Sequence, residues 1–544
     1  MLTDRERRTA ISGGVLSLAG IALFVGVAVI ALLSFDTGQI PTSPILDPYI
    51  GRVLRFTLLQ AVLSTLLSIA LALPVALALA RQPKFRGRIW IIRLMAVPMG
   101  LPVLIGALGL IGIWGRQGIV NSMLSSVGVS APISIYGLFG ILLAHVFFNL
   151  PLACRLMLAG LERVPGEYWR VASGLGMKPV SVFRFIEWPA VARLIPGIAG
   201  LIFMLCATSF TLVLTLGGGP AATTIEVAIY QSLRFDFDPA RAIALSILQI
   251  GMTAVILTGM AFFSTPDDKD ATAGRITRRF DGQGWVAKLA DGTIILLATI
   301  LVGSPLLMIV AAGLRANLMT LVTSAIFIRA TLTSLVISLS AGVLAVLVAI
   351  AIIQAQAALK GKRQRGTVVR SFSSALSATS SLVLLVPPVV LGTGWFLALR
   401  PLSDVARFAP LLIVLINVLM ALPFVMRVLA PAFATHRQRT ARLVAGLGIF
   451  GLARLKMIDV PLLKKPVAMA LSFAMALSLG DLGAVALFGS DQLVTLPWLV
   501  YSRMGSYRTN DADGLALILG LMCLALTIAG TVARMPQERD DDRG

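Results

Sequence analysis

Long apolar stretches with almost no charge dominate the sequence, and the stretches 11–34 and 330–354 are typical. A helix needs about 20 apolar residues to cross the hydrocarbon core of a bilayer. Backbone groups in lipid must pair internally, so only helices and closed barrels span it. The stretches are continuous rather than alternating, which favours helices over barrel strands. Only 13% of the residues are charged, about half the usual share in soluble domains. The sequence therefore predicts an all-α polytopic membrane protein.

Twelve membrane spans are expected from the apolar stretches. The first is too long for the apolar core of a signal peptide and has no small-x-small cleavage site, so we expect it to be retained. The expected spans are 11–34, 56–80, 91–113, 134–157, 194–216, 241–263, 292–313, 330–354, 376–398, 409–430, 466–488 and 514–533.

Basic residues collect in alternate connections between these spans. The net charge of +21 is also typical of nucleic-acid binding, but positive charge in every second loop is the pattern of cytoplasmic loops in membrane proteins. We therefore expect no nucleic-acid partner, contact with membrane lipid, a bacterial inner-membrane location and two cytoplasmic termini. The basic connections include Arg5, Arg7 and Arg8; Arg86, Arg88 and Arg93; Arg163, Arg170 and Arg184; Arg275, Arg278 and Arg279; Lys362, Arg363 and Arg365; and Arg437, Arg439, Arg442, Arg454 and Lys456.

One polar loop occurs twice. The stretch GLGMKPVSVFRFIEWP (174–189) matches GLGIFGLARLKMIDVP (446–461), with Gly176 and Gly448 at 272 positions apart. The same spacing relates Leu150-Pro151 to Leu422-Pro423. We interpret the chain as a tandem duplication of six spans: a first half 1–264, a cytoplasmic linker 265–288 and a second half 289–544. An even number of spans in each half makes the repeats parallel, so the halves can enclose a central path.

Each copy of the loop is predicted to form a helix–turn–helix outside the membrane. In the first copy, Gly174 and Gly176 permit a tight turn, and a second short helix is expected to end at Pro189. The side chains that offer an apolar surface for docking into a groove on a soluble partner are Val180, Val182, Phe183 and Ile186. The alternative is a helix pair that only caps its own bundle.

The spacing of Gly, nine residues and Ile-x-x-Pro resembles the EAA loop of ABC importer permeases, EAA-x3-G-x9-I-x-LP. Arg replaces the leading Glu in both copies. The resemblance implies a type I ABC importer permease fold, in which each loop forms a coupling helix on one subunit of a homodimeric ATPase. The residues expected at the ATPase are Arg170, Ala172, Gly174, Gly176, Phe183, Ile186 and Pro189 in the first loop, and Arg442, Gly446, Gly448, Leu455, Ile458 and Pro461 in the second.

Further segments are similar to the fused bacterial permeases that import thiamine and thiamine pyrophosphate. They are YGLFGILLAHVFFNLPLACRLML (136–158), IWGRQG (113–118), TTIEVAIYQ (223–231) and GDLGAVALFG (480–489). The resemblance implies an ATP-driven importer that receives thiamine or its pyrophosphate from a periplasmic solute-binding protein. Fused ferric-iron importer permeases share the duplication and the loop spacing and stay the nearest alternative. An ATPase-independent secondary transporter or channel is a third hypothesis, and it leaves the repeated loop unexplained.

No catalytic motif is found. The phosphate-binding pattern G-x-x-x-x-G-K-[ST] is absent, and GGGPAATT (217–224) lacks its Lys and is expected on the outer side. His145 and His436 are far apart in the sequence, and three isolated Cys residues form no metal-ligand pattern. We therefore expect no enzyme activity, cofactor or metal in this chain, with ATP and Mg²⁺ bound by the partner ATPase.

A few polar residues near the spans are candidates for the substrate path. Asp481 lies within the eleventh expected span, where a carboxylate is costly unless it faces a cavity or a partner. It can lower the barrier for a thiazolium cation, or it can serve only helix packing. Glu226 and Tyr230, one helical turn apart, can border the outer mouth or meet a binding protein, although a solvated loop acid is an equal alternative. The Gly/Pro-rich stretches 96–112 and 384–395 occupy corresponding places in the two halves and either line the path or form simple kinks.

Overall fold

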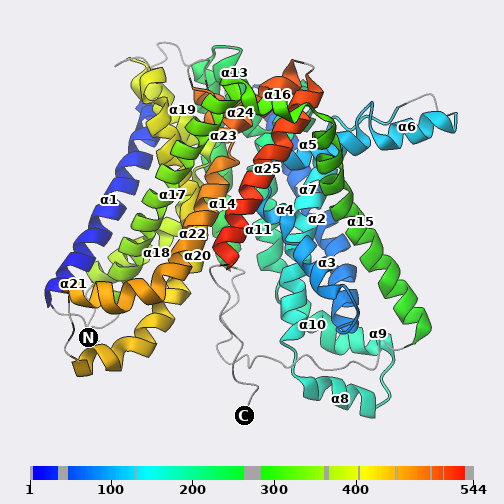
Figure 1. Cartoon of the computed structure of the whole chain (residues 1–544), viewed down its shortest axis with the longest axis horizontal. Helices are drawn as coiled ribbons and strands as arrows, with labels where there is room; N and C mark the ends of the chain where they lie inside the picture. Colours follow the sequence, from blue (N-terminus) through cyan, green and yellow to red (C-terminus); the bar gives the residue numbers. More distant parts are fainter. Residues whose placement is uncertain are drawn as a thin grey trace. The chain divides into compact units, whose positions relative to one another are not determined.

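The computed structural model describes residues 4–34, 47–128, 132–262, 284–359, 367–401, 405–447, 449, 451–489, 493–506 and 508–532. Within these ranges the chain is almost entirely helical (Figure 1). The all-α prediction is confirmed. Most of the expected linker, 265–288, lies outside the described residues.

The first half of the sequence contains fourteen α-helices and short π and 3₁₀ turns among the described residues. Their bounds are α1 Asp4–Ser34, α2 Pro48–Arg81, α3 Arg88–Leu94, α4 Val97–Gly100, α5 Val103–Trp114, α6 Ile119–Ser126, α7 Leu138–Glu162, α8 Gly166–Gly174, α9 Pro179–Val182, η2 Phe183–Glu187, α10 Trp188–Ala192, α11 Ile195–Ala207, α12 Thr211–Leu216, η3 Pro220–Ala222, α13 Ile225–Arg234 and α14 Pro239–Phe262.

The second half repeats much of this order with fewer interruptions. Its described elements are α15 Trp285–Arg315, α16 Leu318–Thr323, α17 Ala325–Leu359, α18 Thr367–Leu385, α19 Pro388–Leu399, α20 Val405–Leu447, α21 Gly451–Arg454, η4 Leu455–Asp459, α22 Val460–Leu479, α23 Gly483–Phe488, α24 Leu496–Gly505 and α25 Thr509–Val532. The short helices α12 and α23 begin and end at residues that are 272 positions apart. The duplication is therefore visible in the element boundaries.

Ten helices in the described part of the chain are long and apolar enough to cross a membrane, or eleven if a pair bent by 51° counts as one span. Twelve continuous spans were expected, and the difference arises where expected spans are broken. The stretch 194–216 is divided between α11 and α12 and falls in the bent pair, and the stretch 376–398 is divided at Val386–Pro387 into α18 and α19. The stretch 91–113 is also broken, into α3, α4 and α5, but Val103–Ser126 still represents it among the ten. Proline lacks an N–H and restricts the residue before it, which interrupts 91–113 and 376–398.

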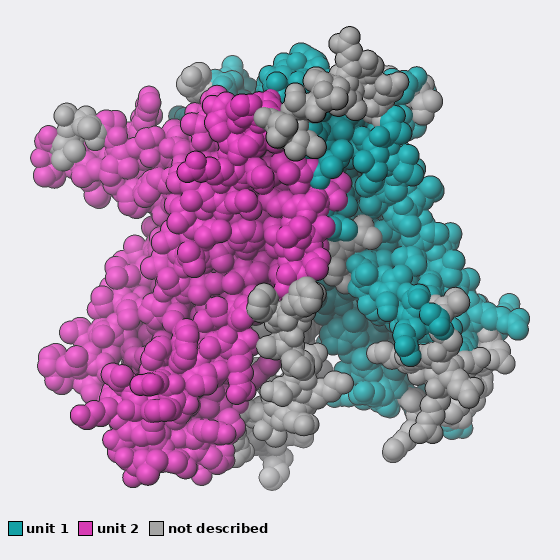
Figure 2. Space-filling view, turned by 180° about the vertical axis from the view of Figure 1, so that it is seen from behind, with its two compact units in different colours: residues 1–40, 229–247, 316–544 teal, residues 41–228, 248–315 magenta. Residues whose placement is uncertain are grey.

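The described helices form two compact units that do not coincide with the two sequence halves (Figure 2). Unit 1 contains residues 1–40, 229–247 and 316–544, and unit 2 contains residues 41–228 and 248–315. In unit 1, α1 packs against α17 and α19 of the second half. In unit 2, α15 packs against α2 and α5 of the first half. The first long helix of each half is thus exchanged into the other half's bundle.

Glycines allow these exchanged helices to approach closely. In unit 2, a Cβ added to Gly109 of α5 would overlap the backbone oxygen of Pro305 on α15. In unit 1, a Cβ added to Gly394 of α19 would overlap the backbone of Ala28 on α1. Only a residue without a side chain permits such contact between two helix backbones. In each unit, the exchanged helix therefore packs at a glycine that allows close contact between helix backbones.

The interior of unit 2 is a continuous apolar core between α2, α7, α11 and α15. Its fully buried members include Ala61, Leu79, Ala153, Met157 and Ile202. Many other apolar side chains on the long helices are exposed, for example Leu66 and Leu297. Exposed apolar side chains on spanning helices are what a lipid environment requires.

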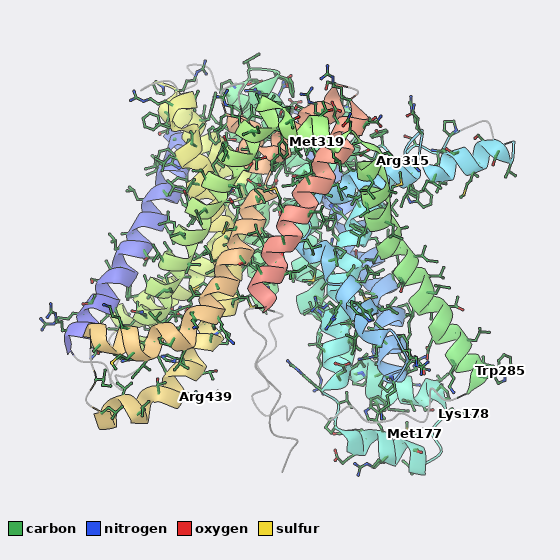
Figure 3. The ribbon with its side chains drawn as sticks, in the orientation of Figure 1. Met177, Lys178, Trp285, Arg315, Met319 and Arg439 are labelled. Carbon is green, nitrogen blue, oxygen red and sulfur yellow. The ribbon has the colours of Figure 1, made fainter. Side chains whose placement is uncertain are left out.

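Each unit has two distinguishable ends. In unit 2, the turn residues Met177 and Lys178 lie at the end where α15 begins with Trp285, and Arg315 lies at the opposite end of α15 (Figure 3). In unit 1, Arg439 near the end of α20 and Met319 on α16 lie at opposite ends (Figure 3). Each copy of the repeated loop therefore occupies one end of its own unit.

Candidate functional site

The first repeated loop, residues 163–192, is a helix–turn–helix formed by α8, α9, η2 and α10. A Schellman motif ends α8: Met177 N–H donates to Ala172 O at 3.0 Å and Gly176 N–H donates to Ser173 O at 3.1 Å. Gly176 has φ +59°, which is the left-handed conformation that this motif requires. Gly174 is exposed, and an added Cβ would meet nothing within 4 Å. Of the two glycines, only Gly176 adopts the left-handed conformation that the turn requires.

A small separate core holds this loop together. It consists of Trp169, Ala172 and Val182, against which Ile186 packs. Phe183 packs instead against the main core of unit 2. Val182 was expected on the docking surface, but it is 3% exposed and is part of this core. The expectation is wrong for Val182 because its helix turns that side chain towards α8.

The opposite side of the loop presents large apolar side chains to the surroundings. The exposed set is Tyr168, Val171, Leu175, Val180 and Phe185. Four of these five were not singled out from the sequence, because only the fold decides which side of a short helix is free. Arg170 is also exposed. The loop thus combines a packed inner side with an apolar outer side, and we call the five exposed residues the first docking surface.

Pro189 does not end the second helix of the loop, contrary to expectation. The preceding residues form the π-turn η2, in which Trp188 N–H bonds to Phe183 O, and the chain continues into α10. Proline has no N–H to give and its ring clashes with the carbonyl four residues earlier, so the turn widens to a π-helix. The helical chain therefore continues through the partly buried Pro189 into α10.

The second repeated loop has the same π-turn but a different first helix. Its turn η4, Leu455–Asp459, lies 272 residues after η2 and precedes α22 directly. In place of a separate counterpart of α8, helix α20 continues to Leu447. Pro165 begins the break in the first loop, and Arg437 stands at the equivalent position. Without a proline the helix has no reason to break there.

The predicted residues of the second loop are only partly described. Ile458 is buried at 7% exposed, whereas Gly446 and Pro461 are exposed. Gly448 and the side chains of Arg442 and Leu455 lie outside the described residues. The left-handed glycine in this loop is Gly451, with φ +63°. The exposed apolar side chains here, which we call the second docking surface, are Leu443, Leu447, Met457, Val460 and Leu462.

An acid closes the π-turn in both loops and is ion-paired in both. Glu187 Oε1 lies 3.6 Å from Arg81 Nε of α2. Asp459 Oδ1 lies 2.6 Å from His436 Nε2 on α20, and its Oδ2 lies 3.4 Å from Arg454 Nε on α21. These acids belong to the repeated pattern, but their partners cannot be recognised from the sequence.

The polar residues expected at the outer mouth are buried. Glu226 and Tyr230 on α13 are 1% and 2% exposed, which contradicts a solvated loop acid. Glu226 Oε1 has no hydrogen-bond partner among the described residues. Burial raises the pKa of Glu226 well above its usual value, because a charged carboxylate loses its hydration there. Glu226 therefore favours its neutral form.

Asp481 has a local structural role in unit 1. Its two carboxylate oxygens accept hydrogen bonds from Gly483 N–H at 3.0 Å and Ala484 N–H at 3.3 Å. It therefore caps the N-terminus of α23 after α22 ends. These bonds account for the carboxylate without a substrate, and its role in a substrate path stays a prediction. No group of three His, Cys, Asp or Glu within the described ranges could hold a metal ion.

Comparison with known proteins agrees with this architecture. Residues 68–265 match the family model for the inner membrane component of binding-protein-dependent transport systems. The thiamine transport system permease protein ThiP of Brucella abortus (strain 2308) is 46% identical over 534 residues, 97% of each chain. The protein of the same name from Escherichia coli K12 is 41% identical over 487 residues, 88% of each chain. That of Haemophilus influenzae is 35% identical over 515 residues, 94% of each chain.

The helical fold and the family match define the class of protein: the membrane-spanning permease subunit of an ABC importer, a transport component rather than an enzyme. Within that class, the chain belongs to the family of the thiamine transport system permease proteins. The resemblance seen in the repeated loops is confirmed.

Proposed function

We propose that this chain imports thiamine, and thiamine pyrophosphate, across the bacterial inner membrane, taking them from a periplasmic binding protein and driven by a separate ATPase. The observation that carries the substrate is the 46% identity with a thiamine permease over 97% of both chains. Ferric iron, the nearest alternative from the sequence, is not favoured, because the relatives reported above are thiamine permeases.

The proposed ATPase contacts are the first and second docking surfaces. Burying a large apolar side chain stabilises a complex by about 1.5–3 kcal/mol, so five exposed residues on each loop supply a strong docking site. Because the π-turns occur at equivalent places in the two halves, the partner is proposed to be a homodimer that binds ATP and Mg²⁺. The two loops then meet two copies of one groove.

The proposed orientation puts both loops and both termini in the cytoplasm. The basic residues of both loops favour that side. In unit 1, Glu6 near the start of α1 accepts a hydrogen bond from Gly451 N–H at 3.0 Å, so the beginning of α1 lies beside the second loop. A reporter fused at either terminus should therefore give a cytoplasmic signal.

Uptake of labelled thiamine tests this function directly. We expect uptake in a bacterial strain that lacks the chain to return when the chain is restored, and to be unaffected by excess ferric iron. If thiamine uptake persists when the ATPase is deleted, the result would instead favour a secondary transporter. If excess ferric iron lowers thiamine uptake, the result would favour the ferric-iron alternative.

A substitution on the first docking surface tests the ATPase contact separately. Val180 is 76% exposed, so Val180→Asp should leave the protein inserted but release the ATPase during purification. The matched control is Lys178→Gln, which changes an exposed polar side chain two residues away. Equal retention of the ATPase by both variants would contradict the docking surface.

A further inference from the structure

Arg81 is the centre of an ion cluster in unit 2. It is the last residue of α2, and its Nη1 lies 3.3 Å from Asp291 Oδ1 while its Nε lies 3.6 Å from Glu187 Oε1. The neighbouring Gln82 donates from Nε2 to Asp291 Oδ2 at 3.1 Å. One guanidinium therefore lies between two carboxylates, and one of these carboxylates also accepts a hydrogen bond from Gln82.

Both carboxylates are removed from water. The side chains of Glu187 and Asp291 are 1% and 2% exposed, whereas that of Arg81 is 27% exposed. A buried carboxylate is costly unless a partner compensates it, and removing one partner of such a group leaves an uncompensated charge. The cluster therefore holds its three side chains in a defined arrangement.

The three residues come from three different parts of the chain. Glu187 closes the π-turn of the first docking loop, Arg81 ends a long helix of the first half, and Asp291 lies on α15, the exchanged helix of the second half. The cluster thus connects the loop with one helix from each sequence half. Because Asp291 belongs to the second half, contacts among residues of the first half alone cannot join the loop to α15.

The second loop is attached differently. Asp459 finds its partners on α20 and α21, close to it in the sequence. Among the described residues, a hydrogen bond from Gly451 N–H to Glu6 joins the second loop to the exchanged helix α1, and that bond is exposed. An exposed hydrogen bond competes with water and resists displacement less than a buried ion pair.

We propose that Arg81, Glu187 and Asp291 are positioning residues that pass movement of the first docking loop to α15, so that the first loop couples ATP hydrolysis to transport more strongly than the second. The proposal rests on the proposed function, because it takes the ATPase to sit on the loops. Movement of the loop reaches α7 and α11 through the chain itself, but it can reach α15 only through contacts that stay intact while the loop moves. The ion cluster is such a contact, because sliding of the loop past α15 would separate buried charges.

The test uses the full complex of this chain, its ATPase and its binding protein in proteoliposomes. Asp291→Asn removes the charge at the α15 end of the cluster and keeps the shape of the side chain. We expect it to retain the ATPase and its basal ATP hydrolysis. The amount of thiamine transported per ATP hydrolysed should fall about tenfold, within the usual size of coupling energies between sites.

The matched control is Glu162→Gln. Glu162 Oε1 pairs with Arg88 Nη2 at 2.7 Å in the same unit, but this pair joins α7 to α3 and does not include the docking loop. Glu162→Gln should leave the transport ratio unchanged. An equal ratio for Asp291→Asn and Glu162→Gln would overturn the proposal.

Two further variants complete the test. Glu187→Gln removes only the Glu187–Arg81 ion pair, and it should also lower the amount of thiamine transported per ATP hydrolysed. It therefore tests the proposal even if Asp291→Asn fails to insert into the membrane. Asp459→Asn removes the equivalent acid of the second loop and should lower the ratio less than Glu187→Gln. A larger effect of Asp459→Asn would overturn the unequal roles of the loops. Failure of the proposed function itself would show differently, as a wild-type chain that neither binds the ATPase nor transports thiamine.

Discussion

Glu187 and Asp459 occupy equivalent positions, 272 residues apart, at the last residue of a π-turn, yet they pair with side chains from different parts of the fold. Glu187 pairs with Arg81, more than a hundred residues away in the sequence. Asp459 pairs with His436 and Arg454 of its own loop region. The two repeated loops therefore share the π-turn, while the helix before it and the partners of its acid differ, so the two loops should respond differently to equivalent substitutions.

His436→Ala should loosen the second docking loop. The substitution removes the imidazole nitrogen that lies 2.6 Å from Asp459 Oδ1 and leaves the carboxylate with Arg454. Loss of a buried partner of a charged group costs about 1–3 kcal/mol. Hydrogen exchange measured on the purified protein should accelerate within α21 and η4. Arg439→Ala, at an exposed position on the same helix, is the control, and equal exchange in the two variants would count against this anchor.

Gly176→Val should disrupt the first docking loop without preventing membrane insertion. Gly176 has φ +59°, and a residue with a side chain pays roughly 1–2 kcal/mol in that conformation. The Schellman motif would open and the first docking surface would lose its shape. We expect less ATPase to copurify and thiamine uptake to fall several-fold.

Gly174→Ala is the matched control for that substitution. Gly174 lies two residues earlier at the end of α8, and its added Cβ would meet no atom within 4 Å. This variant should retain the ATPase and transport normally. If Gly174→Ala and Gly176→Val behave alike, the turn conformation is not what matters for docking.

The sequence alone predicts the parts of this fold that depend on local rules. The apolar stretches indicate the spans, and the spacing of Gly176 indicates the turn, because each follows from a few neighbouring residues. The break before α8 also has a local cause, since Pro165 is replaced by Arg437 in the second half. These features can be recognised without knowing which helices are neighbours.

The features that were missed depend on contacts between distant segments. The exchange of α1 and α15 between bundles leaves no periodic pattern in either helix. The pairing of Arg81 with Asp291 joins residues 210 positions apart. Exposure of Phe185 and burial of Val182, three residues before it, reflect which side of a short helix meets the small loop core. Short apolar helices do not reveal that side by composition.

Substitution of the close-approach glycines should destabilise the exchanged helices. Gly109→Ala would place a methyl group against the backbone of Pro305, and Gly394→Ala would do the same against Ala28. Overpacking of this kind costs about 1–3 kcal/mol. Each variant should have a lower midpoint of thermal unfolding in detergent.

Gly→Ala substitutions at glycines with free space around them should not lower the stability of the protein. Gly26 on α1 and Gly251 on α14 have no atom within 4 Å of an added Cβ. Because alanine favours a helix by about 1 kcal/mol over glycine, Gly26→Ala and Gly251→Ala should leave the unfolding midpoint unchanged or raise it. A uniform response of all four variants would show that helix propensity, and not close packing, dominates.

Glu226→Gln should remove a pH dependence of stability. The folded protein raises the pKa of Glu226 well above its usual value of 4.5, so the folded state holds this proton more tightly than the unfolded state. The resulting stabilisation is complete below the unfolded pKa and is lost as the pH rises towards the folded pKa, by at most about 1.4 kcal/mol per pH unit. Wild-type unfolding midpoints should therefore fall between pH 5 and pH 8, and those of Glu226→Gln should fall less, because glutamine stays neutral. Glu167→Gln, at an exposed position on α8, should keep the wild-type slope. Identical slopes for all three proteins would mean that water or an ion compensates the buried carboxylate of Glu226.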